Sequence, residues 1–359
     1  MLIYARILIN KTILVEKVAH MKIVTVQDIA QIIKKHTFNQ FMLDLITYLK
    51  QDFSRWNEFD KSPRHAIHVD GGVIELMPVA DNKYYTFKYV NGHPKNPFSG
   101  LQTVVATGQL SLVENGYPQM YSEMSLLTGF RTAATAVIAG DLLSRKDSST
   151  LAIIGTGAQS EFQVRAHCLI RPIKNVRYYD TDPAAMDKFA KNMATHGINL
   201  IACDNTEEAV KGADIIVVCT ACKGHVKVIH NDWVKSGVHI SGLGGDCPGK
   251  TELDLDILFR SKVVVEYTPQ SLIEGEIQLL SAEDADKLVY GELWELIANR
   301  KLGRVSDDEI TVFDSVGFAV EDYSVLRLTH DLAEKYALGQ DLDLVPLITD
   351  PKNLISALD

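Results

Sequence analysis

The chain divides into two stretches with different patterns of hydrophobic and polar residues. From about residue 148, short unbroken apolar runs alternate with stretches of helical length. The clearest apolar runs are LAII (151–154), IIVV (215–218) and VVV (263–265). Unbroken runs are typical of parallel strands, which are buried on both faces, and their alternation with helices predicts βαβ units. We therefore expect residues 148–316 to form a doubly wound α/β domain.

The earlier part of the chain follows a different pattern. It predicts a short strand at about Val24 and one amphipathic helix that continues to about Phe53. GGVIELMPVA (71–80) and YYTFKYV (84–90) are rich in aromatic and β-branched residues and predict strands, with a turn at 91–94. The run LQTVVATGQLSLV, followed by ENGYP, predicts a hairpin with a turn at Asn115-Gly116. We expect residues 21–147, together with the C-terminal segment 317–359, to form one α+β domain.

Composition excludes several classes of protein. The chain has 359 residues, 46% hydrophobic and 23% charged, which is ordinary globular composition. Lys and Arg number 36 against 46 Asp and Glu, so the net charge is −10 and binding to nucleic acid or to an anionic membrane is disfavoured. No stretch approaches the ~18 uninterrupted apolar residues of a membrane span. Residues 1–20 lack the pattern of a signal peptide, and we interpret them as an extension or a misread start before Met21. The expected location is cytoplasmic.

The cysteines are few, and they favour no disulfide framework. There are 5, an odd number, which fits a reducing compartment. Cys219 and Cys222 form a CxxC motif, but a structural zinc site needs a second ligand pair, and none is visible. We prefer two buried thiols at a strand end and predict no metal site.

A glycine turn follows the first buried strand of the α/β domain. Gly155-Thr-Gly157-Ala-Gln-Ser160 lies between LAII and a predicted helix, where backbone N–H groups can bind a diphosphate. Ser160 replaces the third glycine, so the motif alone is weak. Asp180, 25 residues after Gly155, ends the next strand and can accept hydrogen bonds from ribose hydroxyls, which favours NAD over NADP. The alternative is a structural turn in which Asp180 only caps the following helix.

Two later loops carry polar residues at strand ends, where open parallel sheets bind their ligands. Thr220 ends IIVVCT, although it could equally be an ordinary loop hydroxyl. Gly244-Gly245-Asp246 and Lys250 follow the strand VHISGL. Desolvation there would give Asp246 a pKa useful for proton transfer, whereas the alternative is a solvated turn.

Charged residues also interrupt predicted elements of the other domain. Glu75 interrupts VIELMPV and Lys88 interrupts TFKYV, and taken alone each is more often a solvent-facing charge. Arg131 is predicted to begin an apolar helix, where it opposes the helix dipole but could clamp a carboxylate. Arg64 is a further candidate.

Taken together, these segments resemble the ornithine cyclodeaminase/μ-crystallin family from about Met21 to near residue 350. The resemblance rests on nine segments, which are FDKSPRH (59–65), GVIELMPVAD (72–81), FKYVNGHP (87–94), FRTAAT (130–135), IGTGAQSEFQ (154–163), YDTDP (179–183), GGDCPGKTEL (244–253), VEYTPQSLIEGEIQ (265–278) and VFDSVGFAVEDY (312–323). It implies a Rossmann-like NAD-binding domain plus an α+β substrate-binding and dimerisation domain built from the N- and C-terminal segments, in a homodimer.

The resemblance also implies an activity, the conversion of L-ornithine to L-proline and ammonia with NAD recycled in each turnover, and thus a place in proline biosynthesis. Asp246 matches the catalytic acid/base, and Glu75 matches a carboxylate near the reacting amines. The implied substrate contacts are Arg64, Lys88, Arg131 and Val316. The implied cofactor contacts are Thr103, Arg131, Gly155, Gly157, Ala158, Gln159, Asp180, Thr220, Leu243, Gly244, Gly245, Asp246, Lys250 and Ser315.

Three other functions stay open. An amino-acid dehydrogenase or imine reductase of this family would release its product after one hydride transfer, and such relatives generally lack an acid at the position of Asp246. A lysine cyclodeaminase differs by one methylene of substrate, which is worth only ~1–3 kcal/mol in a pocket. A non-catalytic binding protein similar to μ-crystallin would keep the nucleotide fold, but the intact set of charged residues favours chemistry.

Overall fold

The computed structural model describes residues 20–222, 224–346 and 348–358, and it contains two compact units. Unit 1 comprises the described residues up to Phe41, Asn57–Thr128, and those from Asp322 onward. Unit 2 comprises Met42–Trp56 and Gly129–Glu321. Unit 2 thus includes 42–56, 129–147 and 317–321, which the sequence analysis assigned to the other domain. The predicted extension 1–20 lies, apart from His20, outside the described residues.

Unit 1 is built on a sheet in the strand order β18-β1-β7-β6-β5-β4-β2, with β3 paired to β4. Its pairs are antiparallel except for β1 with β7. The strands are β1 (His20–Val24), β2 (Asp60–Lys61), β3 (His65–Val69), β4 (Gly72–Ala80), β5 (Tyr84–Gly92), β6 (Val104–Leu112), β7 (Pro118–Glu123) and β18 (Gln340–Asp343). The helix α2 (Val26–His36), the start of α3 (Phe38–Ser54) and most of α12 (Ala319–Tyr336) belong to the same unit.

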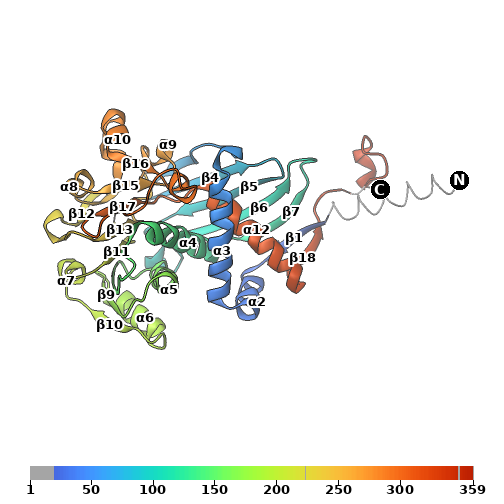
Figure 1. The fold of residues 1–359 in the computed structure, drawn as a ribbon. Helices are drawn as coiled ribbons and strands as arrows, with labels where there is room; N and C mark the ends of the chain where they lie inside the picture. Colours follow the sequence, from blue (N-terminus) through green and yellow to red (C-terminus); the bar gives the residue numbers. More distant parts are fainter. Residues whose placement is uncertain (1–19, 223, 347, 359) are drawn as a thin grey trace. The chain divides into compact units, whose positions relative to one another are not determined.

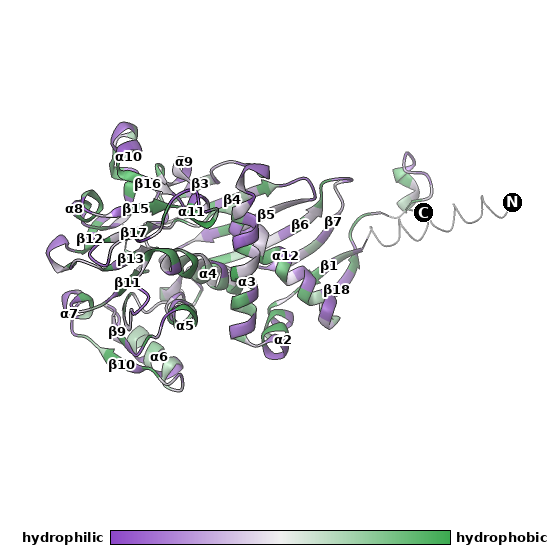
Figure 2. Cartoon of the chain, in the orientation of Figure 1, coloured by the Kyte–Doolittle hydropathy of each residue, from purple (hydrophilic) through white to green (hydrophobic). Residues whose placement is uncertain are grey.

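The predicted strands and hairpin of this unit are confirmed, whereas two details of the prediction are wrong. The expected single helix is divided into α2 and α3 at Thr37, whose φ of 67° is incompatible with a continuous right-handed helix. Both helices carry purple and green in Figure 2, as expected for amphipathic helices. The expected turn at 91–94 begins later, because Asn91 and Gly92 still pair with β6.

Unit 2 contains an eight-stranded sheet in the order β10-β9-β8-β11-β13-β17-β15-β16, in which every pair is parallel (Figure 1). The strands are β8 (Thr150–Ile154), β9 (Asn175–Tyr179), β10 (Asn199–Ala202), β11 (Ile215–Val218), β13 (His239–Gly242), β15 (Lys262–Val265), β16 (Val289–Glu292) and β17 (Thr311–Asp314). The helices are α4 (Ser125–Leu143), α5 (Ser160–Ile170), α6 (Pro183–Met193), α7 (Thr206–Val210), α8 (Leu255–Phe259), α9 (Thr268–Ser271), α10 (Ala282–Leu288) and α11 (Leu293–Ile297). A small sheet pairs β12 (His225–Ile229) with β14 (Thr251–Leu253).

The strand order shows why ligands are expected at one place on this sheet. The chain runs from β8 outward to β9 and β10, then returns to the other side of β8 at β11. The order therefore reverses between β8 and β11, and this is the switch point at which doubly wound sheets bind their ligands. The predicted doubly wound α/β fold is confirmed.

Both faces of this sheet are buried, as the unbroken apolar runs predicted. Leu151 and Ile153 of β8 belong to one hydrophobic cluster, with side chains from α4, α5 and α6. The alternate residues Ala152 and Ile154 belong to a second cluster on the other face, with side chains from α7 and α8. Period-two alternation sends successive side chains to opposite faces, and here both faces are apolar.

The helix α4 corrects another expectation. Arg131 lies inside α4, seven residues into Ser125–Leu143, and not at its start, so the helix-dipole argument for a special role does not hold. By length and composition α4 could cross a membrane, but 78% of its apolar window is buried inside the structure, as in the core helix of a soluble protein. The sequence pattern missed the first turn because Ser125 and Thr128 resemble loop residues.

Candidate functional site

The glycine turn has the geometry that a close backbone approach requires. Gly155 has a φ of 93°, and a Cβ at this position would lie 2.8 Å from the carbonyl oxygen of Cys219. Gly157 is open, since a Cβ there would meet no atom within 4 Å. Ser160 is fully buried and its hydroxyl donates to the Gly157 carbonyl at 2.8 Å. The serine that weakened the motif therefore stabilises the turn at the start of α5.

Asp180 is fixed by backbone N–H groups next to this turn. Its carboxylate accepts hydrogen bonds from the N–H of Thr156 at 2.6 Å and from the N–H of Asp182 at 3.0 Å. Asp182, and not Asp180, caps α6, because its side chain accepts from Ala184 at 2.9 Å. The capping alternative for Asp180 is therefore wrong, and its carboxylate is held beside the glycine turn.

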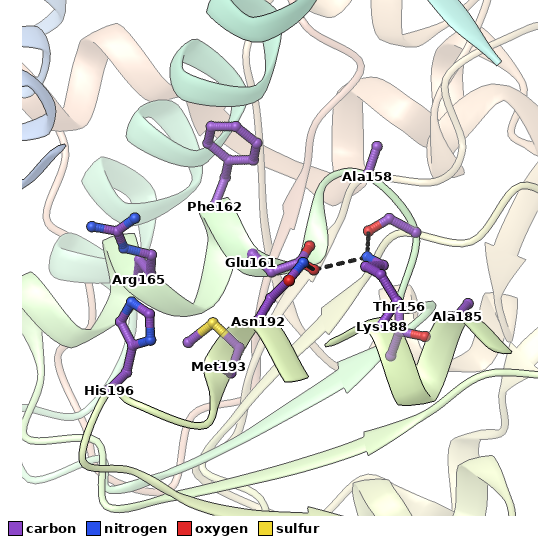
Figure 3. Close-up of a pocket in the computed structure, with 11 residues that line it drawn as sticks. Thr156, Ala158, Glu161, Phe162, Arg165, Ala185, Lys188, Asn192, Met193 and His196 are labelled. Carbon is purple, nitrogen blue, oxygen red and sulfur yellow. Dashed lines mark hydrogen bonds and ion pairs between the residues drawn. The ribbon is translucent and has the colours of Figure 1, made fainter. Parts of the chain in front are cut away.

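A pocket of about 590 Å³ lies beside the same turn, between α5 and α6 (Figure 3). Two of the predicted cofactor residues, Gly157 and Ala158, line it. Lys188 of α6 donates to the Gly157 carbonyl at 3.0 Å and to Glu161 at 2.8 Å. Sequence analysis missed Lys188 and Glu161, because nothing in the patterns of α5 and α6 distinguishes these two charged residues from other solvated charges.

The loop after β13 brings three of the predicted residues together. Lys250 is 7% exposed, and its Nζ donates to Asp246 Oδ1 at 3.0 Å and to the Thr220 carbonyl at 3.1 Å. The side chain of Asp246 is 53% exposed, so this acid can be reached by a ligand. Burial works to lower the pKa of Lys250, but the charges of Asp246 and Glu252 outweigh it and raise that pKa. Leu243, Gly244 and Gly245 form the buried start of the loop.

Three buried carboxylates lie behind this loop, and the sequence analysis assigned none of them. Glu276 accepts the N–H groups of Glu252 and Leu253 at 2.9–3.1 Å, and Asp314 accepts the N–H of Glu276 at 2.9 Å. Burial raises the pKa values of Glu252 and Asp314 to about 7 and that of Glu276 to about 8. Periodicity cannot reveal such groups, because they come from separate elements that only the fold brings together.

A second set of polar residues in unit 2 surrounds the segment after β17. The hydroxyl of Ser315 donates to Glu266 at 2.6 Å, and the N–H groups of Val316 and Gly317 donate to the same carboxylate at 2.9 and 2.7 Å. Arg131 is 6% exposed and donates to Glu321 at 2.8 Å. Ser315, Val316 and Arg131 are thus held by buried acids within one unit.

In unit 1 the predicted charges point inward, against the more common solvent-facing arrangement. Lys88 is 1% exposed and its Nζ donates to Asp322 at 2.9 Å. Arg64 donates to Glu75 at 3.0 Å, and Glu75 is 6% exposed. Buried ion pairs are costly to desolvate and are not explained by stability alone. Thr103 precedes β6 and its carbonyl accepts from His93 at 2.8 Å.

The CxxC cysteines show no metal-binding geometry. Cys219 and Cys222 are each half-buried, whereas two buried thiols were predicted. The Cys219 sulfur lies 3.2 Å from the Gly155 carbonyl, and burial raises the pKa of this thiol. Among the described residues, no cluster of three His, Cys, Asp or Glu side chains could hold a metal ion.

Comparisons with known proteins match most of the length of the chain. The family model described as ornithine cyclodeaminase/mu-crystallin matches residues 25–336. The ornithine cyclodeaminase of Agrobacterium fabrum is 47% identical over 335 residues, covering 93% of this chain and 94% of that protein. A solved lysine cyclodeaminase structure, described as recognising L-lysine, L-ornithine and L-2,4-diaminobutyric acid, is 30% identical with a TM-score of 0.85 over 95% of this chain and 98% of its own. An archaeal alanine dehydrogenase dimer with bound NAD is 31% identical with a TM-score of 0.83 over 91% of this chain and all of its own.

Proposed function

The chain belongs to the ornithine cyclodeaminase/mu-crystallin family, and from that premise we propose that it converts L-ornithine to L-proline and ammonia with NAD as its cofactor. One observation carries the proposal most strongly. An accessible aspartate, Asp246, lies on the glycine loop after β13 in a chain that is 47% identical to an ornithine cyclodeaminase over 93% of its length. Ring closure needs a base at the reacting amine, and dehydrogenases that release their product do not.

The residues of unit 2 fit NAD at the strand-order reversal. The open Gly157 leaves backbone approachable by a diphosphate, and the carboxylate of Asp180 is fixed beside it for ribose hydroxyls. The side-chain oxygen of Gln159 is buried and has no hydrogen-bond partner among the described residues, so a ligand donor can supply one. In this proposal the cofactor contacts in unit 2 are Gly155, Gly157, Ala158, Gln159, Asp180, Thr220, Leu243, Gly244, Gly245, Asp246, Lys250, Arg131 and Ser315. Thr103 is a further proposed contact, which rests on the family resemblance alone.

The proposed chemistry divides between the cofactor and the side chains. When bound, NAD supplies a nicotinamide that accepts a hydride from the substrate Cα and later returns it. Asp246 accepts a proton from the δ-ammonium group of the substrate. Once this proton is lost, the δ-nitrogen can attack the imine carbon at Cα and close the ring, and the α-amino nitrogen leaves as ammonia. Holding nucleophile and electrophile in one bound molecule gives a proximity advantage of ~7 kcal/mol or more. Glu75 is the second carboxylate and acts near the reacting amines.

The substrate carboxylate is bound by cations in this proposal. Arg64, Lys88 and Arg131 are each buried or nearly so and each held by a carboxylate of its own unit, which fixes the direction of their N–H groups. Charge-assisted hydrogen bonds from such cations are the strong ones for carboxylate recognition. Val316 contributes a main-chain contact.

Two other candidates have structural support. The archaeal alanine dehydrogenase and the lysine cyclodeaminase are related over nearly their full lengths, so a single-step dehydrogenase and a cyclodeaminase for lysine are the alternatives. Asp246 favours cyclisation over simple dehydrogenation. The choice between ornithine and lysine depends on one methylene and so on a small difference in binding free energy.

The proposal includes the setting of the enzyme. We propose a cytoplasmic homodimer in proline biosynthesis, joined through unit 1, with no nucleic-acid or membrane partner. The net charge of −10 disfavours polyanionic partners. Support for the dimer comes from the outer face of β4, β5 and β6, where Leu76, Tyr89 and Val105 are each 38–39% exposed.

The decisive experiment incubates purified protein with L-ornithine and a catalytic amount of NAD, and measures proline and ammonia. We expect equal amounts of both products, many-fold in excess of the cofactor, with no accumulation of NADH. NADH formed in proportion to product would indicate a dehydrogenase instead. Parallel reactions with L-lysine and L-alanine separate the two alternatives, since pipecolate and pyruvate are their respective products.

A further inference from the structure

The acid that occupies the space left by Gly244 of the Asp246 loop is Glu252 on β14. It is 0% exposed, and its Oε1 accepts a hydrogen bond from the Thr220 hydroxyl. Its Oε2 is buried with no hydrogen-bond partner among the described residues. A Cβ at position 244 would overlap the same carboxyl group, so Gly244 is the residue that leaves room for it. A buried acid oxygen without a partner is costly and calls for an explanation beyond stability.

Lys250 connects Glu252 to the exposed acid of the loop. Its Nζ lies 3.0 Å from Asp246 Oδ1 and 3.1 Å from the carbonyl oxygen of Thr220, the residue whose hydroxyl binds Glu252. The charges of Asp246 and Glu252 both raise the pKa of Lys250. One buried cation is therefore paired with an accessible carboxylate and lies in the field of a buried one.

We propose that Glu252 is a positioning residue of this site: its carboxyl group fixes Thr220, which in turn accepts from Lys250, so that its gain or loss of a proton sets the net charge around the Asp246 loop. With Glu252 protonated, Asp246 and Lys250 neutralise each other. With Glu252 ionised, the loop has one net negative charge. A negative loop favours the cationic distal amine of the substrate and the transfer of its proton, and this step of the inference rests on the proposed function.

The surroundings of Glu252 place its titration near neutral pH. Burial raises its pKa to about 7, the charge of Lys250 and the hydrogen bond from Thr220 lower it, and the charges of Glu276 and Asp246 raise it. The titratable and charged groups around it are Lys250 and Asp246 on the loop, Glu276 on η4 (Glu276–Leu279), Cys219 after β11, and Asp314 behind Glu276. Lys250 is the cation among these groups, which is why it transmits the change.

The test compares the pH dependence of turnover in the wild-type holoenzyme and in Glu252→Gln. Glutamine keeps an oxygen that accepts from Thr220 but cannot ionise. We expect the ratio of wild-type to variant kcat to rise roughly three- to tenfold as the pH passes through about 7, with the variant held near the low-pH level of the wild type. The control Glu309→Gln removes a carboxylate that pairs with Lys262 at 2.9 Å, and it should follow the wild-type profile. A ratio that does not change with pH would overturn the proposal.

A second measurement does not depend on the reaction. In protein with ¹³C-labelled glutamate, one side-chain carboxyl resonance should titrate with a midpoint near 7, be absent from Glu252→Gln, and move to higher pH in Thr220→Val, because the Thr220 hydrogen bond lowers the pKa of Glu252. Titration of that resonance near 4 would contradict the inference even in an active enzyme. If the resonance titrates as expected but ornithine is not converted, the proposed function fails and the charge switch of the loop stands.

Discussion

At the scale of single residues, the glycines of unit 2 are required for different physical reasons. Gly244 leaves space for a buried carboxyl group, since a Cβ there would overlap Glu252. Gly157 faces open space, so its lack of a side chain contributes nothing to packing. In the proposed site it lets the backbone approach a diphosphate. The two positions therefore separate a stability requirement from a binding requirement.

Alanine at each position tests this separation. Gly244→Ala should lower the free energy of unfolding by about 1–3 kcal/mol, the usual cost of overpacking, as measured by urea denaturation. Gly157→Ala should unfold like the wild type but bind NADH at least tenfold more weakly in a fluorescence titration. Wild-type affinity in Gly157→Ala would remove this turn from the proposed cofactor site.

Asp246 is the residue on which the proposed chemistry depends. Asp246→Asn keeps the shape of the side chain and removes its ability to accept a proton, so kcat should fall by about 10²–10⁴-fold while NADH affinity stays within a few-fold of wild type. Asp286→Asn, an exposed aspartate on α10, is the matched control and should retain full turnover. Turnover near the wild-type level in Asp246→Asn would mean that another group takes the proton.

The sequence predicted these residues unevenly, and the reason is physical. Gly155, Gly157 and Asp180 belong to a local motif whose spacing carries the information. The inward direction of Lys88 and Glu75 could not be read from the strand pattern, because a charge in a strand most often faces solvent, and the buried partner of Lys88, Asp322, lies 234 residues away. For these two residues only the family resemblance indicated a role.

At the scale of elements, β14, η4 and β17 bring three acids together behind one loop. Two of the three bind the backbone beside another acid: Glu276 accepts from two N–H groups of β14, and Asp314 accepts from two of η4. Apolar periodicity identified neither β14 nor β17 as a strand. It could not predict the acids' burial, because burial depends on packing between elements that are 24 and 38 residues apart.

These acids make stability depend on pH with a defined sign. Their pKa values, about 7 to 8 when folded, lie above the ~4 of unfolded chains, so the folded state holds more protons between about pH 5 and 7. The free energy of unfolding should therefore be largest at the acidic end of this window and fall as the pH rises. Glu252→Gln should reduce that slope by up to ~1.4 kcal/mol per pH unit in urea denaturation at several pH values.

Glu309→Gln is the control for this slope. The pKa of Glu309 is lowered when folded, by its hydrogen bonds to Lys262 and to backbone against the opposing effect of burial. The stability that Glu309 contributes is lost only as the pH falls below about 4. The variant should therefore change the free energy of unfolding by the same amount throughout pH 5 to 7 and leave its pH dependence unchanged. A wild-type slope in Glu252→Gln would show that this acid does not hold a proton in the folded protein.

At the scale of the whole molecule, unit 1 leaves one face of its sheet uncovered. Along β5, Thr86, Lys88 and Val90 are buried, whereas the alternate residues Tyr85 and Tyr89 are each 38% exposed. Register places Tyr89 opposite Leu76 of β4 and puts Val105 of β6 on the same face, so these exposed apolar side chains form a strip. Such a strip is typical of a protein interface, and it agrees with the homodimer proposed above.

Tyr89→Lys tests whether this strip joins two copies. A lysine in the centre of the interface would have to be desolvated without a partner, and central aromatic residues often contribute 2 kcal/mol or more to binding. We expect the wild type to sediment at about twice the chain mass of 39.9 kDa and Tyr89→Lys to shift toward the mass of one chain at micromolar concentration. Phe259→Lys changes a side chain that is 60% exposed at the end of α8 in unit 2, and it should remain dimeric because that surface is outside the strip. A wild type that sediments at the mass of one chain would contradict the homodimer. A Tyr89→Lys variant that stays dimeric would place the dimer interface outside this strip.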